Sequence, residues 1–377
     1  MDIGFPREIK DGEARVAGTP ETVRALVRAG HRVLLESGAG AGSGYPDAAY
    51  GEAGAQVVSR PEEAYACPLV VKVKELQPEE YPFLRAGSIL FAYQQLARDA
   101  GLLEAVLERR VTCLAYESVT GEDGGRPLLA PMSTIAGLMS AQIAAWALQH
   151  RDGPWCGSGV LLPWIEGVPR ARVLILGEGT VGSSAARAFL ALGCATSVLG
   201  RVPGNLEALR RRLAQDGTGM LETALCTPAE LQARLPGCDV LVGAVSIPGR
   251  LSPKLVTRAM LRSMRPGSVL VDVGIDMGGV AETSRQTKLS DPVYREEGVL
   301  HYCVGNIPAL VPRSASAALA AATLPYLEQL AGGGLERALE ARPGLRRGLL
   351  VHAGQVLDPG LAEDTGRPCA TFPPSRP

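Results

Sequence analysis

Three glycines with the spacing G-x-G-x-x-G form the motif with the clearest chemical meaning. Gly177, Gly179 and Gly182 follow the apolar run ARVLI, and the segment SSAARAFLALG comes directly after them. Between a strand and a helix, such glycines let the backbone approach a pyrophosphate, because the free N–H groups and the dipole at a helix amino end favour negative charge. We therefore predict a dinucleotide site at Gly177, Gly179, Thr180 and Gly182. A tight turn without a ligand is the alternative.

The end of the next strand selects the dinucleotide. An Asp or Glu about 20 residues after the first glycine normally accepts hydrogen bonds from the ribose hydroxyls. Here the strand TSVLG ends at Gly200, 23 residues after Gly177, and Arg201 follows. Without a carboxylate, Arg201 and Asn205 could bind a 2′-phosphate, so the sequence favours NADP(H) over NAD(H). Arg201 could also face solvent, and for the three arginines at 210–212 an exposed helix surface is the simpler interpretation.

Short apolar runs alternate with amphipathic segments in two successive series. The first series runs from DIGF to VTCLAY, and the second runs from ARVLILG to SVLVDVG. This alternation is typical of parallel sheets covered by helices. An Ala-rich helix is expected over about residues 314–330. The Gly- and Pro-rich segment 152–169 predicts a surface loop between elements.

One uncharged segment, residues 128–150, is long enough to cross a bilayer. It is only mildly apolar, because it is rich in Ala and Gly and contains Pro131, Ser133, Thr134, Ser140 and Gln142. We therefore expect a buried helix between the two series and no membrane partner.

Composition indicates an ordinary globular enzyme or binding protein. The 38 Lys and Arg residues nearly balance the 39 Asp and Glu residues, so we expect no nucleic-acid partner. The eight cysteines are scattered singly without metal-ligand spacing, and the start MDIGFPREIK does not resemble a signal peptide. The sequence therefore predicts reduced thiols, no metal site and a cytoplasmic location.

Nine segments occur in a recognisable order: IGFPREIKDGEARVAGTPE, LVRAGHRVLLESGAGAGSGY, VVKVKE, LAYESV, PLLAPMSTIAGLMSAQ, GEGTVGSSAA, VGAVSIPG, PKLVTRAMLRSMRPGSVLVDVGID and HYCVGNIPALVPRSAS. Together they resemble the alanine dehydrogenase family and, more weakly, the cofactor-binding component of proton-translocating transhydrogenases. The resemblance implies two Rossmann-like doubly wound α/β domains with a cleft between them, linked by long helices. It implies a substrate domain of residues 1–131 and 308–377, a nucleotide-binding domain of residues 132–307, and a homo-oligomer, either a dimer or a hexamer.

The resemblance also implies roles for single residues. Arg15 matches the arginine that binds the substrate carboxylate, and Lys74 matches the lysine at a substrate oxygen. Independently, Lys72 and Lys74 share one face of the strand PLVVKVKEL, where two ammonium groups require an anion. Asp276 matches the catalytic aspartate. The other implied contacts are Tyr93, Glu117, Met132 and Asn306 for the substrate, and Ser133, Val181, Val245 and again Asn306 for the cofactor. A surface arginine and a turn-capping aspartate are the alternatives for Arg15 and Asp276.

The sequence departs from the family at Gln95, where the resemblance implies a catalytic histidine. An amide donates and accepts hydrogen bonds but exchanges no proton near pH 7. The four histidines, His31, His150, His301 and His352, lie elsewhere in the sequence, and we interpret His301 as structural. Lys74, Asp276 and Gln95 are therefore the predicted catalytic residues.

The loss of a histidine affects the two directions of the reaction unequally. Oxidative deamination needs hydride transfer followed by imine hydrolysis, and a positioned acid–base group typically contributes about 10²–10⁴-fold. Reduction needs only an anchored carboxylate, a positioned nicotinamide and one proton, from Lys74, Asp276 or water. The sequence thus favours an NADPH-dependent reductase of a small α-imino or α-keto acid. Alanine dehydrogenase with another proton-transfer group, and a nucleotide-binding protein without catalysis, stay open as alternatives.

Overall fold

The computed structural model describes residues 1–153, 155–214, 219–246 and 251–372. The chain divides into two compact units, Met1–Met132 with Ala309–Pro377 and Ser133–Pro308. These limits lie one residue after the boundaries expected from the sequence. The assignment of substrate binding to the first unit and nucleotide binding to the second stays a prediction.

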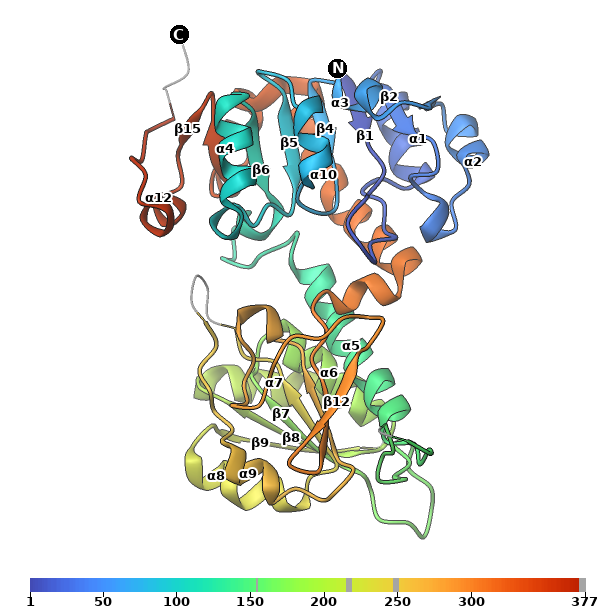
Figure 1. Cartoon of the computed structure of the whole chain (residues 1–377), viewed down its shortest axis with the longest axis vertical. Helices are drawn as coiled ribbons and strands as arrows, with labels where there is room; N and C mark the ends of the chain where they lie inside the picture. Colours follow the sequence, from blue (N-terminus) through green and yellow to red (C-terminus); the bar gives the residue numbers. More distant parts are fainter. Residues whose placement is uncertain (154, 215–218, 247–250, 373–377) are drawn as a thin grey trace. The chain divides into compact units, whose positions relative to one another are not determined.

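Eight strands form the sheet of the first unit, in the order β15-β14-β6-β5-β4-β1-β2-β3. The strands β1 to β6 run parallel, whereas β14 pairs antiparallel with β6 and β15 antiparallel with β14, so the C-terminal region completes one edge (Figure 1). Central strands such as β4, β5 and β6 are buried on both faces, as apolar strands under helical layers should be. The strands are β1 (Asp2–Phe5), β2 (Arg32–Glu36), β3 (Gln56–Val58), β4 (Leu69–Val71), β5 (Ile89–Ala92), β6 (Thr112–Ala115), β14 (Leu349–His352) and β15 (Gln355–Val356).

Helices connect and cover these strands. The side chain of Thr19 accepts the N–H of Thr22 and so caps α1, which Pro20 begins, in agreement with the sequence T-P at its start. The expected Ala-rich helix is longer than 314–330, because α10 continues to Ala341 across Gly334, whose φ of 76° interrupts the helix. The helices are α1 (Pro20–Arg28), α2 (Asp47–Glu52), α3 (Pro61–Tyr65), α4 (Ala100–Glu108), α10 (Pro312–Ala341), α11 (Pro343–Arg346) and α12 (Pro359–Thr365), with short 3-10 turns η1 (Ala41–Ser43), η2 (Pro78–Phe83), η3 (Leu96–Arg98) and η4 (Tyr116–Ser118).

Seven strands form the sheet of the second unit, in the order β12-β13-β11-β10-β7-β8-β9. All pairs are parallel except β12 with β13. Counted in chain order without β12, the arrangement is the 3-2-1-4-5-6 order of dinucleotide-binding sheets. The strands are β7 (Arg172–Leu176), β8 (Ala195–Gly200), β9 (Met220–Leu225), β10 (Val240–Gly243), β11 (Val269–Asp272), β12 (Val293–Glu296) and β13 (Val299–Tyr302). The prediction of two α/β series is confirmed.

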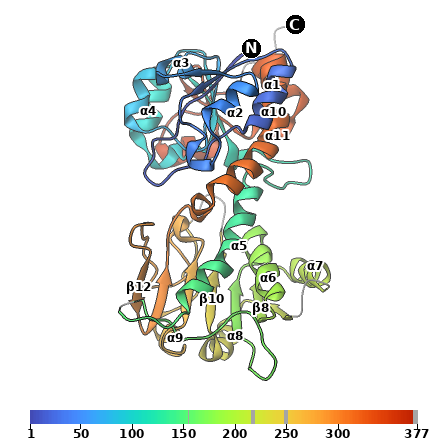
Figure 2. The ribbon, with the colours of Figure 1, turned by 90° about the vertical axis from the view of Figure 1, so that its right-hand side faces the viewer.

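The helices of the second unit include α6 and α7, which both contact β8 (Figure 2). The uncharged segment forms α5 (Ala130–Ala147), and a Cβ on its Gly137 would lie 2.3 Å from the carbonyl oxygen of Val181, so α5 packs closely on α6. Among the described residues, no helix is both long and apolar enough to cross a membrane. The other elements are α6 (Thr180–Ala191), α7 (Pro203–Leu213), α8 (Pro228–Arg234), α9 (Arg258–Arg262), η5 (Leu235–Gly237), η6 (Ile275–Met277) and η7 (Ile307–Leu310).

Candidate functional site

The glycine motif joins β7 to α6, and its three glycines have three different surroundings. Gly177 has a φ of 113°, and a Cβ there would lie 2.5 Å from the carbonyl oxygen of Ala244. A Cβ at Gly182 would lie 1.9 Å from the carbonyl oxygen of Gly177, so the helix packs closely on the turn. At Gly179 no heavy atom lies within 4 Å of an added Cβ, so space is open in front of the helix amino end. These surroundings fit a pyrophosphate, whose approach requires such an open backbone.

A pocket of about 410 Å³ lies beside this turn. Hydroxyl groups and two guanidinium groups line it, which suits an anionic or strongly polar ligand. Its residues are Thr134, Glu178, Gly179, Thr180, Ser183, Ser184, Arg187, Arg212 and Leu213. Val181 lies in the first turn of α6, and Ser133 precedes Thr134 on α5. Cofactor contacts from Ser133 and Val181 stay predictions.

A carboxylate lies at the end of β8, although the sequence has none at Gly200. Oε1 of Glu178 accepts the backbone N–H groups of Arg201 and Val202, each at 3.0 Å. The NADP(H) preference was inferred from the absence of a carboxylate here, and that premise is wrong. Arg201 and Asn205 are exposed at this edge.

The three arginines of α7 differ in their surroundings. Arg210 and Arg211 form ion pairs with Glu207 on the same helix. Arg212 instead lines the pocket beside the glycine turn. All three arginines are exposed, so the interpretation of this run as a solvent-facing helix surface is confirmed, and Arg212 also borders the pocket.

Two loops at the carboxyl ends of the strands come together near Asp276. This residue is exposed in η6, and a Cβ on Gly305 would lie 2.5 Å from its Oδ1. Asn306 follows with a φ of 64°, a left-handed conformation that asparagine tolerates. The structure thus brings Asp276 next to the segment of Asn306. Val245 follows β10, and its carbonyl oxygen accepts the hydroxyl of Ser252.

Asp272, which sequence reasoning missed, holds the loop that carries Asp276. Its Oδ2 accepts the N–H of Val280 at 2.8 Å and the hydroxyl of Ser284 at 2.5 Å. Burial raises the pKa of Asp272 above its usual value. The side chain is buried at the end of β11, so we interpret it as a loop-positioning residue.

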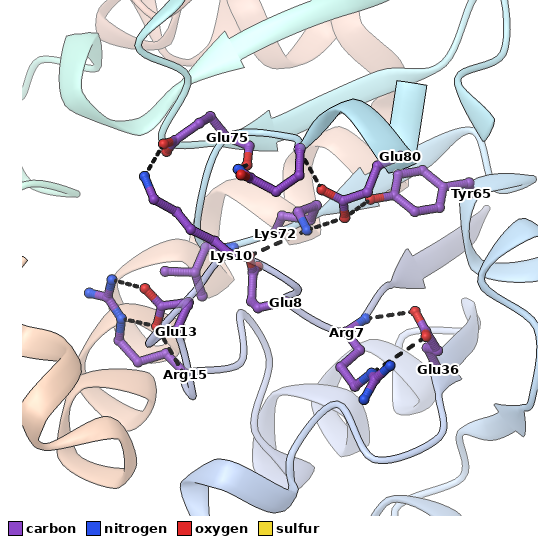
Figure 3. A network of polar contacts seen from close by, with 12 residues as sticks. Arg7, Glu8, Lys10, Glu13, Arg15, Glu36, Tyr65, Lys72, Glu75 and Glu80 are labelled. Carbon is purple, nitrogen blue, oxygen red and sulfur yellow. Dashed lines mark hydrogen bonds and ion pairs between the residues drawn. The ribbon is translucent and has the colours of Figure 1, made fainter. Parts of the chain in front are cut away.

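Arg15 of the first unit is a buried side chain, not a surface arginine. Its Nε and Nη2 donate to the two carboxylate oxygens of Glu13 (Figure 3). Its Nη1 lies 3.1 Å from Sδ of Met132. The hydroxyl of Ser43, in the glycine-rich segment 38–44, donates to the carbonyl oxygen of Ala14 at 2.9 Å. The guanidinium is therefore fixed by its neighbours. A guanidinium has five N–H donors, so one carboxylate partner does not prevent it from binding a second.

Lys72 and Lys74 lie in different environments. The strand β4 ends at Val71, so the alternation of side chains expected along PLVVKVKEL does not reach the two lysines, and that expectation is wrong. Nζ of Lys72 lies 2.5 Å from Oε1 of Glu80 and 3.3 Å from Oε2 of Glu8, and both carboxylates are buried with it (Figure 3). The anion that Lys72 requires is therefore supplied by the protein itself, through Glu8 and Glu80.

Lys74 is partly buried and lies near the charges of Arg15 and Glu75. Within the described ranges, it forms no ion pair. Burial, followed by the nearby charge of Arg15, lowers the pKa of Lys74. Its ammonium group therefore gives up a proton more readily than an exposed lysine does.

Two consecutive glutamines follow β5, and their exposures are opposite. Gln94 is fully buried and its amide donates to the carbonyl oxygen of Leu90, whereas Gln95 is exposed with a φ of 49°. Oε1 of Glu117 accepts the backbone N–H groups of Gln94 and Gln95 at 3.1 and 3.2 Å. In the described part of the chain, its buried Oε2 has no hydrogen-bond partner. Burial raises the pKa of Glu117, and Lys74 is the cation that opposes this effect.

Tyr93 and Met132 complete this group of residues. The hydroxyl of Tyr93 donates to the carbonyl oxygen of Leu128 at 2.7 Å, so it fixes the segment that leads to Met132. Burial raises the pKa of Tyr93, and the charges of Arg15 and Glu117 both act on it. The structure thus brings together Arg15, Lys74, Tyr93, Glu117 and Met132, and their roles toward a substrate stay predictions.

Two family models match the chain: "Alanine dehydrogenase/PNT, N-terminal domain" over residues 4–136 and "Alanine dehydrogenase/PNT, C-terminal domain" over residues 140–359. The chain belongs to the alanine dehydrogenase/PNT family. Alanine dehydrogenase from Halomonas elongata is 43% identical over 97% of both chains, and alanine dehydrogenase 2 from Staphylococcus aureus is 42% identical over 96% of both.

Solved structures of alanine dehydrogenase/PNT proteins agree with this assignment. An L-alanine dehydrogenase matches with a TM-score of 0.91 and 40% identity, covering 97% of this chain and 99% of the other. A transhydrogenase from Sinorhizobium meliloti matches with a TM-score of 0.79 and 27% identity, covering 95% of this chain and 99% of the other. The predicted fold class and the family are confirmed, and the chain is an NAD(P)-dependent oxidoreductase of the amino-acid dehydrogenase type.

In the described residues of this alanine dehydrogenase/PNT member, each of the four histidines has a hydrogen-bond partner close to it. Nε2 of His301 lies 2.7 Å from the hydroxyl of Thr283, and its Nδ1 lies 3.0 Å from the carbonyl oxygen of Val299. His301 is therefore a structural residue of the second unit. The other three histidines make contacts through Nδ1. His31 contacts the amino group of Met1, His150 contacts Cys156, and His352 contacts Thr112.

Proposed function

We propose that this family member transfers a hydride between a nicotinamide dinucleotide and a small α-imino or α-keto acid. The observation that carries the proposal is the group formed by Arg15, Lys74 and Glu117. It combines a buried guanidinium held by Glu13, a lysine without an ion pair among the described residues, and a buried carboxyl group that accepts two backbone N–H groups. Two cations and one carboxyl group of raised pKa suit a small acid with an imine nitrogen or carbonyl oxygen. When bound, the dinucleotide supplies a hydride to the substrate carbon in reduction and accepts one in oxidation.

Each residue of the group has a proposed task. Arg15, oriented by Glu13, binds the substrate carboxylate. Lys74 donates a hydrogen bond to the imine nitrogen or carbonyl oxygen, and its lowered pKa supports proton release to that atom. Glu117 is proposed as the second acid–base group, because its buried Oε2 has no hydrogen-bond partner among the described residues and burial raises its pKa. Reduction then adds one hydride to carbon and one proton to nitrogen or oxygen.

The remaining predicted residues keep their proposed roles. Gln95 and Asp276 take part in catalysis, the former through hydrogen bonds alone. Tyr93, Met132 and Asn306 contact the substrate, and Ser133, Val181, Val245 and Asn306 contact the cofactor. The sequence-based choice of NADP(H) has lost its premise, so the preferred dinucleotide depends on Glu178. Assembly as a homo-oligomer, a dimer or hexamer, and a cytoplasmic location are also proposed from the resemblance.

Gln95 favours the reductive direction. Hydrolysis of the imine requires a group that activates water, and the amide of Gln95 cannot do so. Alanine dehydrogenase activity is the second candidate, favoured by the 43% identity to a relative of that name. In that case Glu117 would have to supply the missing acid–base function.

The two candidates separate in a turnover assay. Absorbance of the reduced nicotinamide is followed with NADH and with NADPH, using pyruvate with ammonia, pyruvate alone and a preformed imino acid, and in reverse with L-alanine. We expect reduction of the imino acid to be faster than oxidation of alanine. Equal or faster alanine oxidation would identify an alanine dehydrogenase, and no turnover with any substrate would leave a nucleotide-binding protein.

A substitution separates substrate binding from cofactor binding. Arg15→Lys keeps the charge but removes the two-pronged contact with a carboxylate, so the KM for the acid should rise roughly 10- to 100-fold. The affinity for the dinucleotide should not change. A loss of dinucleotide affinity would contradict the roles proposed here.

A further inference from the structure

The carboxyl end of β8 has no acidic residue, and the glycine turn that follows β7 has one. Dinucleotide-binding sheets normally have an Asp or Glu at this strand end for the ribose hydroxyls. Here Gly200 occupies that position, and the acid stands instead at Glu178, between Gly177 and Gly179. The parallel register of β7 and β8, which pairs Leu176 with Leu199, brings both positions to the same edge of the sheet.

The Glu178 carboxylate lies where a side chain at position 200 would lie. A Cβ on Gly200 would come within 2.6 Å of Oε2 and 2.7 Å of Cδ of Glu178. On its other side, this Cβ would come within 2.8 Å of Cδ2 of Leu206. The Glu178 carboxylate therefore fills the space that an acidic side chain at position 200 would need. Only glycine at position 200 leaves room for it.

Hydrogen bonds fix Glu178 in this place. Its Oε1 accepts the N–H groups of Arg201 and Val202 at 3.0 Å each. Within the described residues, Oε2 has no hydrogen-bond donor and no Lys or Arg forms an ion pair with the group. A carboxylate has about four acceptor positions, so Glu178 can still accept hydrogen bonds from a ligand. Glu178 also lines the pocket beside the glycine turn.

We propose that Glu178 replaces the strand-end acid, accepts the hydrogen bonds of the adenosine ribose and so selects NAD(H) over NADP(H). This inference rests on the proposed use of a nicotinamide dinucleotide. A 2′-phosphate would meet a like charge at this position. The backbone N–H groups of Arg201 and Val202 could bind a phosphate, but both already donate to Glu178.

Arg187 and Arg212 line the pocket that Glu178 also lines. Exposed Arg201 is the arginine next to Gly200, and as an argument for NADP(H) it is weaker than the carboxylate. Its backbone N–H is bonded to Glu178, whereas its side chain faces solvent, where one guanidinium contact with a phosphate is strongly screened. Arg201 could bind a 2′-phosphate effectively only if the carboxylate were removed.

Direct binding tests the inference without turnover. The dissociation constants of NADH and NADPH are measured on the full chain by the fluorescence of the reduced nicotinamide, for the wild type, Glu178→Gln and Arg201→Ala. Hydrogen bonds to a charged group are worth about 1.5–3 kcal/mol, so the wild type should bind NADH roughly 10- to 100-fold more tightly than NADPH. Glu178→Gln should remove most of this difference, and Arg201→Ala should leave it.

Two further variants control for charge and for folding. Glu207→Gln removes a carboxylate from nearby α7 that already pairs with arginines, so it should not alter the preference. Gly200→Asp alone should weaken NADH binding, because its side chain meets Glu178. The double variant Glu178→Gly, Gly200→Asp restores the usual position of the acid and should recover NADH binding.

The outcomes distinguish this inference from the proposed function. Binding of NADPH as tight as or tighter than that of NADH in the wild type would overturn the role of Glu178 and leave the proposed oxidoreductase intact. An unchanged preference in Glu178→Gln would do the same. Failure of both nucleotides to bind the wild type would overturn the proposed function and this inference together.

Discussion

Lys72 and Lys74 stand two residues apart, yet they belong to two different kinds of charged cluster. Lys72 is enclosed with Glu8 and Glu80, and its side chain is 1% exposed. Although burial opposes it, these two carboxylates hold the pKa of Lys72 above its usual value. Burial also raises the pKa of Glu8, but both carboxylates pair with Lys72 inside the protein, and this pairing indicates a structural role for the cluster.

The second cluster is built from Arg15, Lys74 and Glu117. Arg15 pairs with Glu13, whereas Lys74 and Glu117 form no ion pair among the described residues. The pKa of Lys74 is lowered and that of Glu117 is raised, in both cases mainly by burial. Buried groups whose charged forms are disfavoured are costly to a fold and are characteristic of sites where a ligand completes the set. The difference indicates that the first cluster contributes stability and the second contributes chemistry.

Removal of Lys72 should have the largest effect and should act on stability. Lys72→Met leaves Glu8 and Glu80 buried without their cation, which typically costs about 3–5 kcal/mol. The free energy of unfolding in urea measures this loss. A double variant with Glu80→Gln removes one of the stranded carboxylates and should recover part of it. A variant Lys72→Met as stable as the wild type would show that the cluster is not structural.

Replacement of the Glu117 carboxyl group by an amide should lower the rate of catalysis. Glu117→Gln keeps an oxygen that can accept the N–H groups of Gln94 and Gln95, but it cannot transfer a proton. We expect kcat to fall about 100-fold with little change in unfolding. Glu79→Gln, at an exposed carboxylate, is the matched control. If kcat is unaffected over the whole pH profile, Glu117 is only a positioning residue.

Removal of Lys74 should separate the two clusters most directly. Lys74→Met takes away a partly buried ammonium group that has no ion pair among the described residues, so unfolding should change by less than about 1 kcal/mol. The KM for the α-keto or α-imino acid should rise roughly 10- to 100-fold, because a charged hydrogen bond is lost. A destabilisation as large as that of Lys72→Met would erase the distinction drawn between the two lysines.

The local parts of this molecule are predictable from sequence, since spacing alone determines them. The roles of Gly177, Gly179 and Gly182 depend on a strand–turn–helix of six residues, and the alternation of apolar runs identifies the two sheets. The grouping of Arg15, Lys74 and Glu117 was accessible only through the family resemblance, because these residues lie on three separate segments of the chain.

The partners of the charges are not predictable in the same way. Lys72 pairs with Glu8 and Glu80 just after the end of β4 at Val71, whereas the sequence predicts that the strand continues through PLVVKVKEL. Glu178 reaches the end of β8 through the register of two strands, which the sequence does not display. One signal was available: the acid missing at Gly200 and the acid present in the glycine turn could have been read together.

The smallest effect should be a pH dependence that belongs to Glu117 alone. Its pKa is raised in the folded protein, so the stability from this group is fully present below its unfolded pKa and is lost as pH rises through its folded pKa. Relative to Glu117→Gln, the wild type should therefore lose stability over that window, by about 1.4 kcal/mol for each unit between the two pKa values. Glu8 also has a raised pKa, but it titrates in both proteins and cancels from the difference. Urea unfolding of the wild type and Glu117→Gln between about pH 4 and 8 measures this difference in stability. A difference that stays constant with pH would mean that the pKa of Glu117 is the same in the folded and unfolded protein, and the proposed role of Glu117 as an acid would lose its support.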